Sequence, residues 1–223
     1  EIDRKDEVGV AIGMAWTEFG GELLSFEATK IQGKGNFTLT GQLGEIMQES
    51  AQAAFSYVRG KMYDMGLSQN IHRDFDIHIH VPEGSVPKEG PSAGITIATA
   101  IISLLTGIPV SKKVAMSGEI TLKGKVLSVG GIKEKLLAAY REGIKVAILP
   151  LDNKPDLKDL PKKLKENMTI HFVDHMDQVL DIALVEDIYK YAEAKRAEKK
   201  RKAKLAKEKK EEEPQAPDQP VTH

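Results

Sequence analysis

The chain has 223 residues, which is enough for one large domain or two small ones with a substantial core. It contains no cysteine, which excludes disulfides and thiolate metal sites and fits a reducing compartment. The formal net charge is −1, but residues 190–223 hold 11 basic and 7 acidic residues, a net +4, so the remaining 21 basic and 26 acidic residues carry −5.

The first part of the chain predicts β-structure and one helix. Strands are expected at residues 8–16, 22–31 and 76–81, with turns at residues 19–21 and 33–37. From Leu43 to Met65, apolar residues recur at helical spacing, which predicts a long amphipathic helix. The stretch DIHIHV at residues 76–81 alternates strictly between polar and apolar residues, as a half-buried strand does.

An uncharged run extends from Gly90 to Ser111 and is about as long as a bilayer is thick. It contains two prolines and several Ser and Thr residues, and Lys112 and Lys113 follow at once. We therefore predict a helix that is buried on all sides in a globular core, rather than one that crosses a membrane.

The rest of the body alternates strands and helices without a strict β-α-β rhythm. We expect strands within residues 114–132 around a turn at 123–124, a helix at 133–143, a strand at 145–150, a helix at 157–166, a strand at 169–173 and a helix at 176–184. This order predicts a mixed-sheet α/β (α+β) domain over residues 1–185. Residues 186–223 predict a charged, helix-prone tail without an apolar face, and its end has a composition typical of disorder.

The sequence PKEGPSAG, residues 87–94, places a lone serine, Ser92, between a Gly-Pro corner and the apolar helix. Helix N-termini present free backbone N–H groups and the positive end of a dipole. A carbonyl attacked by the Ser92 hydroxyl would develop its negative charge beside those donors, as an oxyanion hole requires. The alternative is that Ser92 only caps the helix, which is a common role for serine.

A serine nucleophile needs a base, and a lysine can serve if burial lowers its pKa enough to keep it neutral. The predicted helix KEKLLAAYREG offers Lys133 and Lys135, and a step of two residues turns a helix by about 200°, so only one can face Ser92. Helical periodicity favours Lys133, whereas Lys135 sits beside Ala138 and Ala139 on a face of small residues. Either could instead be a surface lysine.

Two histidines, His78 and His80, share one face of the DIHIHV strand, in line with Asp76. Such a pair could bind a metal. A polar, partly solvated strand face is the more common explanation of this pattern.

Several long motifs, in the same order along the chain, resemble the proteolytic domain of the Lon protease family. They are GMAWTEFGGELLSFEA, GKGNFTLTGQLGEIMQESAQAA, DIHIHVPEGSVPKEGPSAGI, MSGEITLKGKVLSVGGIKEKLLAA, and KVAILP followed by DNKPDL. The resemblance covers nearly the whole body and ends near Glu186. It implies the Lon proteolytic α/β fold, similar to a ribosomal protein S five domain two-like arrangement. It also implies a serine endopeptidase that uses a Ser–Lys dyad and an acyl-enzyme.

The resemblance assigns Ser92 as the nucleophile and selects Lys135, rather than Lys133, as its partner. Ser117 stands in MSGE where the family has MTGE, and its hydroxyl would hydrogen-bond the lysine. Further residues match positions that line or support the family's site. They are Glu27, His78, His80 and Glu89, the last at a position that is usually aspartate in the bacterial enzymes.

Lon proteins of this type also carry an ATPase module, but this chain contains no G-x-x-x-x-G-K-[ST] phosphate loop, and Gly33–Gly35 is too short to form one. The chain therefore resembles an excised protease domain. We expect no metal and no cofactor in it, with ATP and Mg needed only by the ATPase module. The resemblance implies unfolded or damaged polypeptides as substrates and a homo-oligomer, a six-membered ring. We expect a cytoplasmic location and no membrane association.

Two other functions remain open from the residues alone. PKEGPSAG loosely resembles the loop that holds nucleotide phosphates in some small-molecule kinases on a related fold. The basic tail could bind nucleic acid, although Glu residues interleave with its lysines and no aromatic residue follows Tyr191 for base stacking.

Overall fold

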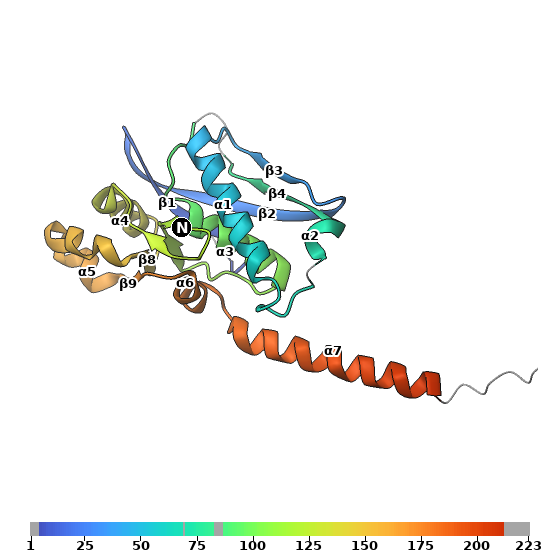
Figure 1. Ribbon diagram of the computed structural model, residues 1–223. Coiled ribbons are helices and arrows are strands. Elements are labelled where there is room, and N and C mark those ends of the chain that lie inside the picture. Colours follow the sequence, from blue (N-terminus) through green and yellow to red (C-terminus); the bar gives the residue numbers. More distant parts are fainter. Residues whose placement is uncertain (1–4, 69, 83–86, 212–223) are drawn as a thin grey trace, which may run out of the picture.

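The structure of the chain is a computed structural model that describes residues 5–68, 70–82 and 87–211 (Figure 1). The end predicted to be disordered, residues 214–223, lies outside the described residues. The main sheet has seven strands in the order β3-β4-β2-β1-β5-β8-β9. Their bounds are β1 Val10–Thr17, β2 Gly20–Gln32, β3 Phe37–Thr40, β4 Phe75–His80, β5 Val114–Met116, β8 Val146–Pro150 and β9 Thr169–Val173. A separate two-stranded ribbon consists of β6 (Glu119–Ile120) and β7 (Val126–Leu127).

Strand directions make this a mixed sheet. β2 pairs antiparallel with β1 and with β4, whereas β3 with β4, β1 with β5, β5 with β8, and β8 with β9 are parallel. β1 and β2 form an antiparallel hairpin, whereas the parallel pairs β3–β4, β5–β8 and β8–β9 are each connected through helical segments, because parallel strands need a crossover connection. The predicted mixed-sheet α/β fold is confirmed.

Helices cover both faces of the sheet (Figure 1). One face carries the larger hydrophobic cluster, to which α1 (Glu45–Lys61), α3 (Gly94–Thr106) and α6 (Met176–Ala183) contribute. The opposite face carries a second cluster, with α4 (Ile132–Arg141) and α5 (Lys162–Asn167) over the strands from β1 to β9. The alternation of strand residues explains the split, since Met116 and Ile148 face the first cluster while their neighbours Ala115 and Leu149 face the second.

The connection after β8 differs from the predicted helix at residues 157–166. A 3-10 helix, η1 (Leu151–Asp159), comes first and α5 follows, because Pro161 stands between them as the residue before α5. A proline has no N–H to continue a helical ladder, so a single helix cannot run through this point. Residues 114–132 also differ, since they form β5 and then the β6–β7 ribbon rather than two longer strands. A short helix, α2 (Ile71–Asp74), precedes β4.

The apolar run does form a core helix, as predicted. Every residue of α3 except Leu104 is buried. Two of its hydroxyl groups are satisfied by the helix itself, since Thr99 Oγ1 donates to the Ile95 carbonyl and Thr106 Oγ1 to the Ile102 carbonyl, both at 2.8 Å. Thr96 Oγ1, by contrast, is buried without a hydrogen-bond partner among the described residues. Within the described part of the chain, no helix combines the length and the apolar character needed to cross a membrane.

The turn between β2 and β3 is built around a carboxylate. The backbone N–H groups of Lys34, Gly35 and Asn36 all donate to Asp76 Oδ1, at 2.9, 3.0 and 2.8 Å. These bonds, first those of Asn36 and Lys34, hold the pKa of Asp76 below its ordinary value. The glycines of GKGN therefore serve a turn that wraps a side chain of the neighbouring strand.

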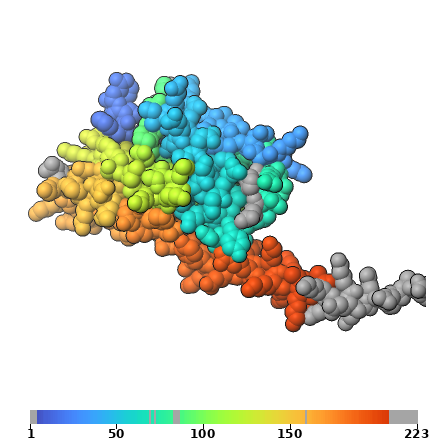
Figure 2. Space-filling model, in the orientation of Figure 1, coloured from blue at the N-terminus to red at the C-terminus, as the bar shows by residue number. Residues whose placement is uncertain are grey.

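The last described helix is α7 (Ile188–Glu211), which extends away from the body in Figures 1 and 2. The sequence predicted no apolar face here, but Ile188 and Ala192 in the first two turns are buried. Arg196 Nη2 donates to the carbonyls of Tyr63 and Asp64 at 3.0 and 2.8 Å. These carbonyls belong to the turn that follows α1, so the arginine also satisfies acceptors near the end of that helix. The two buried residues, the Arg196 hydrogen bonds and a side-chain hydrogen bond between Tyr189 and Asp177 thus attach an otherwise exposed, charged helix.

Candidate active site

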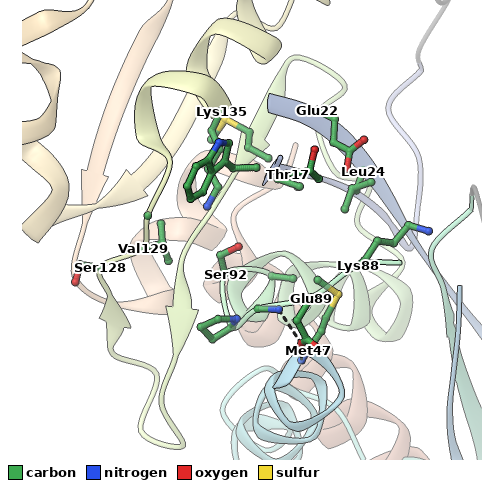
Figure 3. Close-up of a pocket in the computed structure, with 18 of the residues that line it drawn as sticks. Thr17, Glu22, Leu24, Met47, Lys88, Glu89, Ser92, Ser128, Val129 and Lys135 are labelled. Atoms are coloured by element: carbon green, nitrogen blue, oxygen red, sulfur yellow. Dashed lines mark hydrogen bonds between the residues drawn. The ribbon is translucent and has the colours of Figure 1, made fainter. Parts of the chain in front are cut away.

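A cavity of about 580 Å³ lies where the end of β1, the segment before α3, the segment before α4 and the start of η1 meet. Ser92 and Lys135 both line it, and Figure 3 shows both side chains pointing into the same space. Part of the lining comes from the end of β1 and from the start of η1 after β8, which is the usual position of a site in an open α/β sheet, and part from the antiparallel strand β2.

Tertiary contacts hold the segment that carries Ser92. The Lys88 N–H donates to the Gln42 carbonyl at 3.0 Å, and the Gly44 N–H donates to the Lys88 carbonyl at 2.8 Å. Ser50 Oγ donates to the Pro91 carbonyl at 3.1 Å. Gly90 has a φ of +105°, a backbone conformation that favours glycine and turns the chain toward α3. The serine is therefore held on a fixed corner.

Ser92 is not the cap of α3. The helix begins at Gly94 with Ala93 as its N-cap, and no side chain caps it. The Ser92 hydroxyl makes no hydrogen bond to any described residue, while its backbone carbonyl accepts from the Gly118 N–H at 2.9 Å. The capping alternative is therefore wrong, and the hydroxyl is left available to the cavity that it lines.

Lys135 reaches the cavity from the first turn of α4. It is only 3 % exposed, and its Nζ donates to Ser117 Oγ at 3.0 Å. Ser117, fully buried at the end of β5, makes in turn a long contact of 3.5 Å from its Oγ to the Ser92 carbonyl. No salt bridge joins Lys135 to a carboxylate within the described ranges. Burial without a counter-charge lowers the pKa of Lys135 from 10.5 to about 8.

Helical periodicity favoured Lys133, but the structure places Lys135, and not Lys133, in the cavity that Ser92 lines. Lys133 is exposed, whereas Lys135 is buried beside Ser117. The apolar stripe of α4, with Ile132 and Leu136, packs on the sheet, while the cavity lies at the end of the sheet. Proximity to the apolar stripe therefore did not identify the lysine that lines the cavity.

Glu89 lines the cavity but its carboxylate is engaged elsewhere. Its Oε1 accepts from the Gly90 N–H at 2.9 Å and from the Met47 N–H at 3.1 Å. Met47 is the third residue of α1, so the carboxylate caps the positive end of that helix. Close approach requires Gly44, because a Cβ there would overlap Glu89 Oε2. Glu89 therefore ties the Ser92 segment to α1.

The structure does not bring Glu27, His78 and His80 to the Ser92 cavity. They lie on a part of the sheet that we call the open face, with Glu27 of β2 paired to His80 of β4. His78 Nε2 and His80 Nδ1 each lie 2.7 Å from Thr40 Oγ1. Glu27 lines a second cavity, of about 570 Å³, together with Val10 and other residues. Within the described residues, no three His, Cys, Asp or Glu side chains form a group that could hold a metal ion.

Sequence reasoning missed one part of the cavity wall. Residues 128–130, before α4, and Asn153, in η1, both line the cavity. The available signal was position, since DNKPDL directly follows a buried parallel strand, and polar residues at that end of a strand commonly belong to sites.

Comparisons with known proteins agree with this geometry. A family described as "Lon protease (S16) C-terminal proteolytic domain" matches residues 1–186. Lon protease of Solibacter usitatus is 56% identical over 187 residues, which are 84% of this chain and 23% of that protein. Lon protease of Dictyoglomus thermophilum is 55% identical and that of Aquifex aeolicus 56% identical, each over 195 residues, 87% of this chain and 24% of the relative.

Fold, cavity and matches together define a peptidase domain. More specifically, the chain belongs to the family of Lon protease C-terminal proteolytic domains. The chain spans about a quarter of the length of the curated relatives that it matches.

Proposed function

We propose that this chain is a serine endopeptidase domain that hydrolyses peptide bonds of unfolded or damaged polypeptides, with Ser92 as nucleophile and Lys135 as general base. One observation carries the proposal. The Lys135 amine is buried without a counter-charge, its pKa is lowered to about 8, and it shares a cavity with the Ser92 hydroxyl. A base with a pKa near working pH combines a usable deprotonated fraction with enough basicity to accept a proton.

In the first step, neutral Lys135 accepts the Ser92 hydroxyl proton while Oγ attacks the substrate carbonyl carbon. Ser117 Oγ accepts one N–H of the amine at 3.0 Å, which leaves the nitrogen lone pair free to be aimed at Ser92. The carbonyl oxygen becomes an oxyanion, and backbone N–H groups around Ser92 and the start of α3 would stabilise it, apart from that of Ile95, which donates to the Gly118 carbonyl at 3.2 Å.

In the second step, the tetrahedral intermediate collapses and the C–N bond breaks. The lysine ammonium returns its proton to the leaving amine, so the C-terminal part of the substrate departs with a new free amino group and the N-terminal part remains as an ester on Ser92. Water then attacks the ester, with Lys135 again accepting the proton, and hydrolysis releases the second peptide and restores both side chains.

The remaining features of the proposal concern what acts around this domain. Its relatives are about four times as long, so we propose that peptide hydrolysis belongs to this domain and needs no cofactor, while ATP and Mg serve a separate ATPase module. Folded proteins should be poor substrates, because the proposed reaction needs an extended peptide in the cavity and this domain is not proposed to unfold its substrates. We further propose a homo-oligomer, a hexameric ring, located in the cytoplasm.

The test is hydrolysis of an unstructured fluorogenic peptide without ATP by four proteins: wild type, Ser92→Ala, Lys135→Ala and Lys133→Ala. Wild type and Lys133→Ala should cleave the peptide, and the other two should not. Cleavage by Ser92→Ala at the wild-type rate would exclude the dyad. Stimulation of this chain alone by ATP would contradict the division of labour between the two modules.

A further inference from the structure

One wall of the Ser92 cavity contains a side chain that pairs with backbone. Asn153 follows β8 in η1 and is only 5 % exposed. Its Oδ1 accepts from the Val129 N–H at 2.9 Å, and its Nδ2 donates to the Val129 carbonyl at 2.8 Å. A side-chain amide that meets both backbone groups of one residue replaces the hydrogen bonds that a neighbouring strand would make.

Asp156 determines how this amide is oriented. Asn153 Nδ2 also donates to Asp156 Oδ2 at 2.7 Å. An ionised carboxylate can only accept, so the NH2 group of the amide must face it, and the amide oxygen is then directed at the Val129 N–H. Both hydrogens of the Asn153 amide are used, one for Asp156 and one for Val129. Asp, Leu or Ala in place of Asn153 could not provide this donor.

The segment that Asn153 holds has few other ties. Residues 128–130 connect β7 to α4 outside helix and strand, and Ser128 and Gly130 are exposed. The only hydrogen bonds that residues 128–130 make to other described residues are the two between Val129 and Asn153, one donated by the Val129 N–H and one accepted by its carbonyl. Lys135, by contrast, is held by its own helix and by Ser117. Loss of Asn153 would therefore loosen the cavity wall more than the base.

We propose that Asn153, oriented by Asp156, is a positioning residue for peptide substrates. It keeps residues 128–130 in place as one wall of the cavity, so that an extended peptide meets a preformed cleft. The inference rests on the proposed function for the kind of ligand, but it concerns binding and not the bond-breaking step. If the wall were disordered before binding, the free-energy cost of ordering it would offset part of the favourable free energy of the peptide contacts, and affinity would fall.

Binding can be measured without hydrolysis because Trp16, the one tryptophan of the chain, lines the same cavity. In a Ser92→Ala background, an unstructured peptide without a fluorophore is titrated while tryptophan fluorescence is followed. Asn153→Ala should raise the peptide Kd about tenfold or more. The matched control Asn167→Ala, an exposed asparagine of α5, should leave Kd unchanged.

Steady-state kinetics with Ser92 intact provide the second readout. Asn153→Ala should raise KM by the same factor as Kd, with kcat and the midpoint of the pH–rate profile unchanged, because Lys135 keeps its surroundings. Asn153→Asp should be at least as impaired, since its carboxylate would face Asp156 and could not donate to Val129. Adding Asp156→Asn to Asn153→Asp should recover part of the affinity, because the two side chains again form an amide–carboxylate pair.

An unchanged Kd for folded Asn153→Ala would overturn the inference, as would a fall in kcat or a moved pH midpoint with Kd unchanged. If circular dichroism shows that Asn153→Ala does not fold, the peptide Kd of Asn153→Asp is compared with that of Asn153→Asp/Asp156→Asn. Equal Kd values for these two variants would then overturn the inference. A wild type that binds the peptide but does not cleave it would refute the proposed hydrolysis alone. Weaker binding by Asn153→Ala would still support the inference in that case.

Discussion

The Ser92 cavity and the open face of the sheet both present titratable side chains, but in opposite surroundings. Lys135 is buried with a single hydroxyl partner, and its pKa is lowered to about 8. His78 and His80 lie on the outer side of the sheet, where they share the hydroxyl of Thr40. Histidine is the usual base near neutral pH and lysine is not. In the proposed mechanism, burial rather than the type of residue therefore selects the base.

Replacing the buried amine should have the largest effect. Lys135→Met should lower kcat/KM by about 1000-fold or more, because general-base catalysis contributes on this scale. The same variant should be more stable at pH 7. The pKa of Lys135 is about 8 in the folded state and 10.5 in the unfolded state, so protonation favours the unfolded chain. At pH 7, below both pKa values, the buried lysine therefore lowers the free energy of unfolding by up to about 3 kcal/mol. Peptide assays and urea unfolding measure both effects, and Lys133→Met is the control that should change neither.

The dependence on pH should be the next largest effect. Between pH 6 and pH 8 the neutral fraction of a group with a pKa of about 8 rises about 50-fold, and kcat should rise with it and then level off. The stability of the wild type should also rise from pH 8 to pH 10.5, as the unfolded state loses its extra proton. Lys135→Met should lack that rise. A flat rate profile in a chemistry-limited assay would remove Lys135 from the role of base.

Ser117 offers a finer test of the buried side. Ser117→Ala should lower kcat about 10-fold by releasing the amine from its orientation. The pH midpoint should move down, because the lost acceptor stabilised the charged form of the lysine more than the neutral form. Ser117→Thr keeps the hydroxyl and should remain close to wild type in both respects. An upward shift of the midpoint in Ser117→Ala would contradict the idea that the hydrogen bond at 3.0 Å stabilises the charged form of Lys135.

The open face should give the smallest effect. His78→Ala, His80→Ala and Glu27→Gln should each leave peptide hydrolysis within about twofold of wild type, as expected of surface substitutions away from a site. Hydrolysis rates and thermal unfolding, measured side by side, separate activity from stability. A large loss of activity in a stably folded histidine variant would show that the open face also contributes to hydrolysis, which would contradict the comparison.

Several parts of the fold could be predicted from the sequence, because they depend on local pattern. The alternation in DIHIHV correctly placed His78 and His80 on one strand face, and the uncharged run from Gly90 became the buried helix α3. The helix expected at residues 157–166 was wrong in its bounds, since Pro161 divides that segment.

The site was harder to predict because it depends on contacts between distant segments. The sequence motif led to Ser92, but periodicity selected Lys133, and the choice of Lys135 came only from family resemblance. Which way α4 points its first turn is decided by the sheet that it packs on. The pairing of Asn153 with Val129, 24 residues apart, has no sequence pattern of its own.

The Asp76 turn also explains why a glycine-lysine-glycine sequence need not bind a nucleotide. Three backbone N–H groups converge on one point there, as they do in loops that hold phosphate. The point is already taken by a carboxylate of the same chain, which acts as a tethered competitor at high effective concentration. A free phosphate would have to displace an anion that cannot diffuse away. The Asp76 carboxylate thus occupies the position that an anion would take in the loop of residues 33–36.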